Sequence, residues 1–248
     1  MAIDEIYLSL VKSVLAQRDP AIVESTMTRA ACLSYPDLLV SEKSLASLFG
    51  EEIGPNLRVR SDHEQVKKYH GLPADFGPIY ETESLFEHLR VQSDFIDVKK
   101  LRGPEKIVDL NELLPAEYHQ TYDLVIDTGT LEHCFNIGNA FRSMCEMTKL
   151  GGYIITMAPM TSVNHGFWNL CPTAYLDGFD QNGFALQYLQ ARYKDASGVK
   201  FIDFSKGPAN RVIAPPEATL MCVARRTSVE QFKWPIQSKY KAMLSAGG

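Results

Sequence analysis

Three carboxylates in the middle of the chain each follow a short apolar run. Asp97, Asp109 and Asp127 end these runs, and Thr128-Gly129 continues the third. A carboxylate at the end of a strand can accept two hydrogen bonds from ribose hydroxyls, as acids do in nucleotide-cofactor sites. Each Asp could instead cap a helix or a turn. Because the three occur in consecutive runs, we predict that they share a functional site.

His165 is the residue best suited to acid–base chemistry. It lies between Asn164 and Gly166, shortly after another apolar run at 153–158. A neutral imidazole can remove a proton from a hydroxyl group near physiological pH. The alternative is a histidine that shapes its loop by hydrogen bonding to a backbone carbonyl. We predict that His165 is the catalytic residue.

Short apolar strands alternate with helices around these residues, which favours parallel strand pairing. The predicted strands are 29–40 with a break at Tyr35-Pro36, 94–98, 106–110, 122–127 and 153–158. The predicted helices are 82–90 and 136–149, the second stopped by Gly151-Gly152. Two late strands, 184–193 and 219–224, have no helix between them and predict an antiparallel edge pair. In such sheets ligands bind at the carboxyl ends of the strands.

The length of 248 residues fits a single domain over 1–248. Residues 1–18 have the apolar spacing of an amphipathic helix. Residues 42–80 are the least periodic stretch, and we predict an insertion or lid there with one short helix. Residues 227–248, with Trp234, are predicted to form a tail that docks on the domain or on a partner.

The overall composition excludes several classes of protein. The chain has 25 Lys+Arg against 30 Asp+Glu, and this net charge of -5 disfavours nucleic-acid binding. A basic face built from Arg58, Arg60, Lys67 and Lys68 would favour it again. No apolar stretch is long enough to span a membrane. The five cysteines form no C-x-x-C pair, so we expect a cytoplasmic protein without a metal site.

Two motifs resemble a known family. Residues 122–133 read Y-D-L-V-I-D-T-G-T-L-E-H, and after a helical segment residues 149–157 read K-L-G-G-Y-I-I-T-M. This order resembles class I S-adenosylmethionine-dependent methyltransferases. Residues 164–172, N-H-G-F-W-N-L-C-P, are similar to a bacterial subset of that family associated with glycans and secondary metabolites. The resemblance is strong over residues 94–172.

The resemblance implies a Rossmann-like, seven-stranded, mostly parallel sheet with helices on both faces, and S-adenosylmethionine as the cofactor. It implies that Asp97 binds the ribose and that Asp109 and Leu110 contact the adenine. The wall of the methionine pocket would be formed by Asp127, Thr128 and Gly129, and the turn that opens the active site by Glu132 and His133. From the residues themselves, Phe167, Trp168 and Tyr175 could form an aromatic wall for an acceptor such as a sugar ring, and core packing is the more common explanation for such side chains.

One feature departs from the family pattern. The first strand runs into Ser34-Tyr35-Pro36-Asp37, where these enzymes have a glycine-rich turn. Either these residues, including Tyr35, form a different cofactor wall, or the cofactor does not bind. We predict methyl transfer to an oxygen, in preference to a nitrogen, of a small molecule or saccharide, by a monomer or a homodimer. The alternatives are a non-catalytic binding or scaffold protein and a nicotinamide-dependent oxidoreductase, which needs the glycine turn even more.

Overall fold

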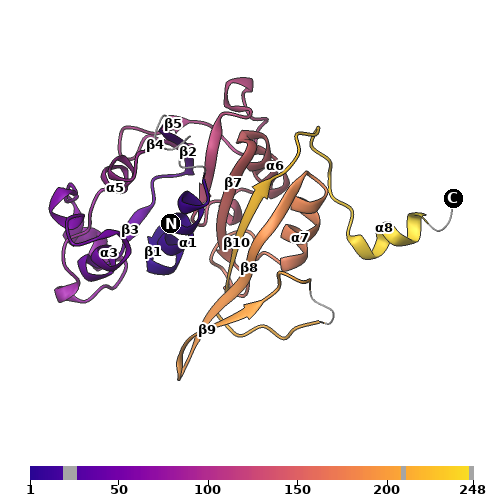
Figure 1. Ribbon diagram of the computed structural model, residues 1–248. Coiled ribbons are helices and arrows are strands. Elements are labelled where there is room, and N and C mark those ends of the chain that lie inside the picture. The colour runs from indigo at the N-terminus through magenta and orange to yellow at the C-terminus, as the bar shows by residue number, and fades with distance from the viewer. Residues whose placement is uncertain (19–26, 208–210, 246–248) are drawn as a thin grey trace. The chain divides into compact units, whose positions relative to one another are not determined.

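A computed structural model describes residues 1–18, 27–207 and 211–245 of the chain (Figure 1). The chain divides into two compact units, residues 1–108 and 109–248, and each unit is described by itself. Both units combine strands with helices, which confirms the predicted α/β class. Within the described ranges, no helix has the length and apolar character needed to cross a membrane. The single domain over 1–248 stays a prediction.

Parallel strands form the main sheet of the first unit. They are β2 (Thr28–Leu33), β4 (Val91–Asp97) and β5 (Lys106–Ile107), in the order β5-β4-β2. Helix α5 (Thr82–His88) contacts β4. The predicted break at Tyr35-Pro36 is confirmed, because the chain leaves β2 and enters β3 (Asp37–Leu39). β3 pairs in parallel with β1 (Ala2–Asp4) in a separate two-stranded sheet.

The turn after β2 has a left-handed backbone without a glycine. Ser34 has a φ of 71°. Its N–H donates to the carbonyl oxygen of Ile96 at 2.7 Å, and its hydroxyl lies 2.8 Å from the sulfur of Met1. A left-handed conformation costs a residue with a Cβ about 1–2 kcal/mol. These contacts therefore hold a backbone conformation that glycine adopts more easily.

The N-terminal helix is confirmed as α1 (Glu5–Ala16). Asp4 caps it, because its side chain accepts a hydrogen bond from the Tyr7 N–H at 2.9 Å. The buried face contains Tyr7, Leu8, Val11 and Val14, which repeat at helical spacing. Burial of this stripe explains why the sequence pattern identified the helix.

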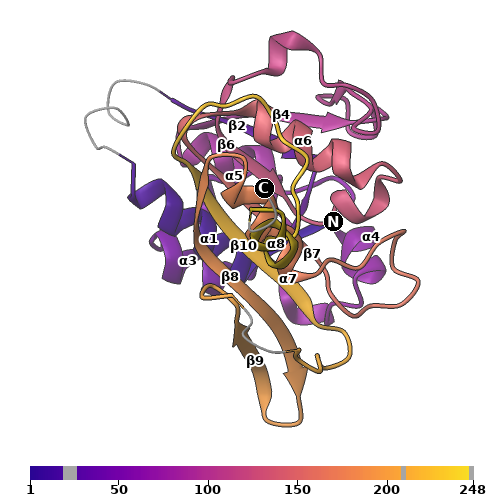
Figure 2. The ribbon, with the colours of Figure 1, turned by 90° about the vertical axis from the view of Figure 1, so that its right-hand side faces the viewer.

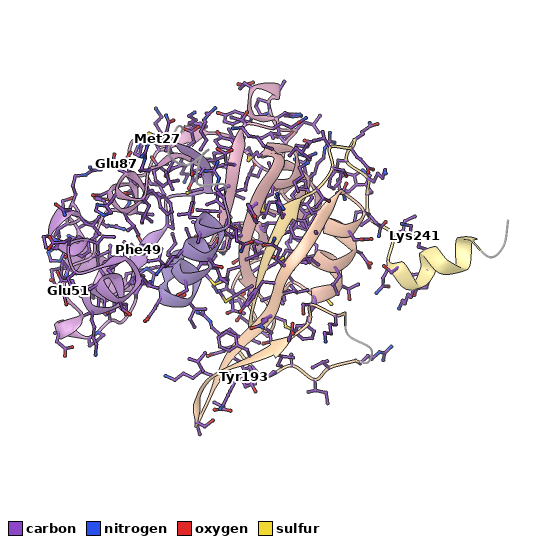
Figure 3. All side chains as sticks on the ribbon, viewed as in Figure 1. Met27, Phe49, Glu51, Glu87, Tyr193 and Lys241 are labelled. Carbon is purple, nitrogen blue, oxygen red and sulfur yellow. The ribbon has the colours of Figure 1, made fainter. Side chains whose placement is uncertain are left out.

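Residues 42–80 are more regular than predicted. They form α3 (Glu42–Phe49), η1 (Gly54–Asn56), α4 (His63–Tyr69) and η2 (Ala74–Phe76), where the sequence predicted a single short helix. Figure 3 labels Phe49 and Glu51 at the end of α3. Helices of two turns contain too few apolar positions to show a clear period. The role of the segment as an insertion or lid stays a prediction.

The basic residues of this segment do not form a basic face. Arg58 pairs with Glu87 at 2.7 Å, and Lys67 pairs with Glu64 at 2.5 Å. Arg60 is buried and pairs with two aspartates, Asp37 and Asp62. Carboxylates thus neutralise three of the four cations named in the sequence. The positive charge of this cluster is therefore largely balanced by neighbouring carboxylates.

The sheet of the second unit combines parallel and antiparallel strands. Its strands are β6 (Tyr122–Asp127), β7 (Thr148–Pro159), β10 (Thr219–Arg226), β8 (Phe184–Asp195) and β9 (Gly198–Asp203), in this spatial order. β6 and β7 are parallel, and the remaining pairs are antiparallel. The predicted antiparallel edge is confirmed, but β9 adds a third strand to it. The main sheets of the two units contain three and five strands, eight in all where seven were predicted.

Two helices accompany the second sheet. α6 (Ile137–Met147) contacts β6 and β7, and α7 (Pro172–Asp180) contacts β8 and β10. Phe141 and Phe179 join the two helices with ring centroids 4.8 Å apart. The predicted helix stop at Gly151-Gly152 is wrong, because α6 ends at Met147 and β7 runs through both glycines. Two short turns complete the unit, η3 (Ala116–Tyr118) and η4 (Leu131–His133).

The predicted tail docks on its own unit. The Asn182 side chain bonds to both backbone groups of Lys233, accepting at 2.7 Å and donating at 3.0 Å. Gln181 makes the same two contacts with Ile236, at 3.1 and 2.8 Å. Beyond these bonds, α8 (Ser238–Ser245), which carries Lys241, extends away from the sheet of this unit (Figures 1 and 3), and Figure 2 views the helix end on.

Candidate functional site

The candidate site lies at the carboxyl ends of β6 and β7. β6 ends at Asp127, and the chain then turns through Thr128 and Gly129 into η4, which contains Glu132 and His133. β7 ends at Pro159, and the following loop carries His165. Because the two strands are parallel neighbours, both turns emerge at the same edge of the sheet. This is the edge at which open α/β sheets bind ligands.

Asp127 holds the turn together. Its side chain is buried and accepts hydrogen bonds from the N–H groups of Gly129 at 3.2 Å and Thr130 at 2.7 Å. Its second oxygen accepts from the Thr156 hydroxyl at 2.7 Å, and Thr156 is the register partner of Asp127 on β7. Burial raises the pKa of Asp127 to about 6, while these hydrogen bonds oppose the rise. Asp127 therefore stays ionised at pH 7 and fixes the shape of the turn.

Two glycines confine the side chain of Glu132. Gly129 has a φ of 103°, and a Cβ added there would lie 2.9 Å from the Glu132 Oε1. A Cβ added at Gly166 would lie 2.8 Å from the Glu132 carbonyl oxygen. Only glycine fits at these positions without a shift of the backbone or of the carboxyl group. The glutamate is therefore held in one place from two sides.

Glu132 is a buried acid with few hydrogen-bond donors to stabilise a negative charge. It is 1% exposed, and its Oε2 has no hydrogen-bond partner in the part of the chain that is described. Burial, followed by the charge of Asp127, raises the pKa of Glu132 to about 8. Asp127 accepts hydrogen bonds from the Thr156 hydroxyl and from the backbone N–H groups of Gly129, Thr130 and Leu131, whereas the Glu132 Oε2 has no donor among the described residues. Of the two acids, Glu132 therefore holds the proton at pH 7.

Two histidines flank the carboxyl group of Glu132. The Oε1 atom lies 3.9 Å from the His133 Nε2 and 3.5 Å from the His165 Nε2. The two imidazole rings are 5.5 Å apart. Partial burial and the nearby His165 lower the pKa of His133, which favours its neutral form. The structure thus brings together three of the predicted site residues.

Hydrogen bonds fasten the loop after β7 to the turn after β6. The N–H of Phe167 donates to the Glu132 carbonyl oxygen at 2.8 Å. The indole N–H of Trp168 donates to the Cys134 carbonyl oxygen at 3.1 Å, and the Leu170 N–H bonds back to Pro159. These bonds lie on both sides of the loop and fix where His165 stands relative to Glu132.

An aromatic surface borders this site. Phe135 and Phe167 are exposed and meet edge to face with centroids 5.4 Å apart, and Trp168 lies 6.2 Å from Phe135. Tyr175 does not belong to this wall, and its position agrees with the alternative of core packing. Tyr175 is fully buried, stacks on Phe179, and its hydroxyl lies 3.2 Å from the Thr156 hydroxyl. It packs in the core, whereas Phe167 and Trp168 do face solvent.

The remaining predicted residues of the second unit differ in their surroundings. Thr128 is buried, and its hydroxyl has no partner within the described ranges. Asp109 is exposed and accepts two hydrogen bonds from Asn111, at 2.9 and 2.8 Å, so it stabilises a turn. Leu110 is buried. Neither Asp109 nor Leu110 lies on a strand, since β5 ends earlier than the sequence predicted.

Tyr35 and Asp97 lie in the first unit. Asp97 is the last residue of β4, as predicted, and accepts from the Lys99 N–H at 3.3 Å. The Tyr35 hydroxyl donates to Glu81 at 2.5 Å, and its ring lies 4.4 Å from that of Phe95. Burial and the carboxylate of Glu81 raise the pKa of Tyr35. Its hydroxyl is therefore already bound, and the cofactor roles of both residues stay predictions.

Sequence reasoning missed Thr156 and the proximity of Glu132 to both histidines. A signal for the second was present. Glu132 and His133 follow one strand directly, His165 follows the next, and parallel neighbours bring such residues to one edge. For Thr156 the sequence carried no signal, because a threonine within a buried strand is unremarkable without its register partner.

The comparisons with known proteins concern the fold. No family model and no curated protein matches the chain. The CurJ carbon methyltransferase matches with 11% identity and a TM-score of 0.49 over 90% of this chain and 54% of its own. The DszA carbon methyltransferase matches with 10% identity and a TM-score of 0.47, over 90% of this chain and 52% of its own. The N-methyltransferase NodS from Bradyrhizobium japonicum WM9, solved with S-adenosyl-l-homocysteine, matches with 10% identity and a TM-score of 0.41. The match covers 89% of this chain and 87% of the NodS chain.

These matched structures are methyltransferases, the class that the motifs of this chain resemble. The chain spans about half the length of the two carbon methyltransferase chains. With such low identities and TM-scores, the case for a function depends on the residues of the chain itself.

Proposed function

We propose that the chain is an S-adenosylmethionine-dependent methyltransferase. It would transfer a methyl group to an oxygen, in preference to a nitrogen, of a small molecule or saccharide. The observation that carries the proposal is the cluster at the carboxyl ends of β6 and β7, in which Thr128 and Glu132 each keep a buried polar atom without a partner in the described residues. Buried polar atoms of this kind normally have a partner, which a polar ligand can supply.

The chemistry of the cluster fits the cofactor. The methionine part of S-adenosylmethionine carries an ammonium and a carboxylate, and the Thr128 hydroxyl can donate to one or accept from the other. Glu132 offers an acceptor for a cationic group. Asp127 supports the turn, since its oxygens already accept hydrogen bonds from Gly129, Thr130 and Thr156. When bound, the cofactor supplies an electrophilic methyl group on a sulfonium.

The chain would contribute position and proton transfer. His165 is about half exposed, so an acceptor hydroxyl can reach its ring. We assign it the role of accepting the hydroxyl proton, with the loop bonds of Phe167 and Trp168 fixing its place. The aromatic surface of Phe135, Phe167 and Trp168 offers ring faces to an apolar or saccharide acceptor.

A non-catalytic binding or scaffold protein is the second candidate, and one observation favours it. No glycine-rich turn follows β2, which is the first strand predicted from the sequence. The Tyr35 hydroxyl, which could replace part of that turn, is bound to Glu81. If this reading is correct, the folded protein does not bind the cofactor at all.

Titration calorimetry separates the two candidates. We expect micromolar binding of S-adenosylmethionine and S-adenosylhomocysteine, with NADH as a negative control. Thr128→Val removes one hydroxyl and should weaken binding. Asp97→Ala tests the ribose role, and Asp203→Ala, which alters the strand-final aspartate of β9, is its control. A folded protein that binds neither compound would support the scaffold candidate.

Methyl transfer to hydroxylated acceptors is measured by the S-adenosylhomocysteine that is released, and amines are tested as the comparison set. His165→Ala should bind the cofactor normally and lose at least about tenfold in turnover. His119→Ala, an exposed histidine elsewhere in the same unit, should retain full activity. Full activity of His165→Ala would refute its assigned role.

A further inference from the structure

Glu132, His133 and His165 offer three ligand atoms that all lie within 4.8 Å of one another. We infer that these three side chains bind a divalent transition-metal cation. The inference goes beyond the proposed methyl transfer and does not depend on it, because the site needs neither cofactor nor acceptor. No metal-ligand spacing is visible in the sequence, since the third ligand lies 32 positions after the second, on another loop.

The distances between the ligand atoms suit a metal ion. The Glu132 Oε1 lies 3.5 Å from the His165 Nε2 and 3.9 Å from the His133 Nε2. Two ligands at about 2.1 Å from a zinc ion, at tetrahedral angles, lie about 3.4 Å apart. Small rotations of two exposed imidazoles would bring all three atoms to this spacing. The carboxylate need not move.

The carboxylate is prearranged for a cation. Glu132 is 1% exposed, and its Oε2 has no partner in the described residues. Close contacts at Gly129 and Gly166 hold the side chain from two sides, and the Phe167 N–H holds the backbone of Glu132. Fixed ligands of this kind reduce the ordering that binding requires. A buried acid with an unused oxygen beside two imidazoles is poorly satisfied by protein groups alone.

The ligand types select the class of metal. Two imidazoles and one carboxylate suit zinc, cobalt or ferrous iron, whereas magnesium and calcium favour oxygen ligands alone. Three protein ligands leave at least one coordination position open. The histidines are 47% and 53% exposed, so that position is accessible to water or to an oxygen of a ligand.

The test uses tag-free protein stripped of metals with a chelator and then dialysed. Zinc titrated by calorimetry should bind at one ion per chain, and magnesium at the same concentration should not. Cobalt should give visible absorption bands of a four- or five-coordinate site. Neither measurement needs catalysis, so a failed metal test leaves the methyltransferase proposal standing, and the reverse also holds.

Variants locate the ion. His133→Ala, His165→Ala and Glu132→Gln should each weaken zinc binding at least about tenfold and remove the cobalt bands. His119→Ala is the matched control, because His119 faces Glu146 at 3.8 Å in the same unit, and no third ligand lies within reach among the described residues. The two histidine variants change exposed side chains, so they should fold even if Glu132→Gln does not. Absence of zinc binding, or binding that survives both histidine substitutions, would overturn the inference.

Discussion

Replacing Glu132 by Gln should change how the stability of the second unit depends on pH. Burial and the charge of Asp127 raise the pKa of Glu132 from 4.5 to about 8. Between these values the folded protein keeps a proton that the unfolded chain has released. The free energy of unfolding therefore falls as the pH rises through this window. Glutamine has the same shape and no charge, so the variant should lose this dependence.

The magnitude follows from the linkage relation. One proton contributes at most about 1.4 kcal/mol per pH unit, which sets an upper limit of about 4 kcal/mol between pH 5 and pH 8. Asp127, with a pKa raised to about 6, adds a smaller fall in the same direction at the acid end of the window. Glu132→Gln should therefore be more stable than the parent at pH 8, and the difference should shrink toward pH 5.

The assay is urea unfolding at several pH values in chelator-containing buffer, so that no cation binds the carboxylate. Both tryptophans, Trp168 and Trp234, lie in the second unit, so fluorescence reports on the unit that carries Glu132. Glu117→Gln, a change of an exposed acid in η3, is the control and should follow the parent curve. Parallel pH curves for the parent and Glu132→Gln would refute the assignment of the proton to Glu132.

Three further outcomes are expected. Thr156→Val removes a donor to the buried Asp127 and should cost about 1–3 kcal/mol of stability at pH 7, measured by urea unfolding. Gly166→Ala places a Cβ 2.8 Å from a backbone carbonyl oxygen of η4 and should cost about 1–3 kcal/mol by crowding, measured in the same way. Asn182→Ala removes both bonds to the Lys233 backbone and should speed tryptic cleavage there, whereas unchanged cleavage would mean that other contacts hold the tail.

The central strands were predictable because their pattern is unambiguous. β6 matches its predicted range, 122–127, since a short apolar run followed by a turn at Thr128-Gly129 is typical of a buried strand. β9 was missed because its burial alternates along a short edge strand, which weakens the apolar signal. Gly151-Gly152 was misread as a helix stop. A Cβ at Gly152 would lie 3.0 Å from the Asp123 carbonyl oxygen, so glycine is needed there for close approach of two backbones.

The candidate site was predictable in outline only. The positions of Asp127, Glu132 and His165 follow from parallel strands that end at one edge. Their protonation and metal-binding capacity depend on distances of a few ångströms between loops, which no local pattern encodes. Asp109 shows the same dependence on tertiary contacts. A turn-forming aspartate and a ligand-binding one look alike in sequence, and the bonds from Asn111 establish only the turn-forming role, so the adenine contact of Asp109 stays a prediction.

The left-handed Ser34 bears on how such turns are recognised. A tight turn after a strand often requires a left-handed backbone conformation, and glycine is the residue that usually adopts it. In this chain serine reaches it, with its amide and hydroxyl both engaged. A sequence signature written in glycines therefore overlooks a turn in which serine adopts the left-handed conformation. A signature written in backbone dihedral angles would include such a turn.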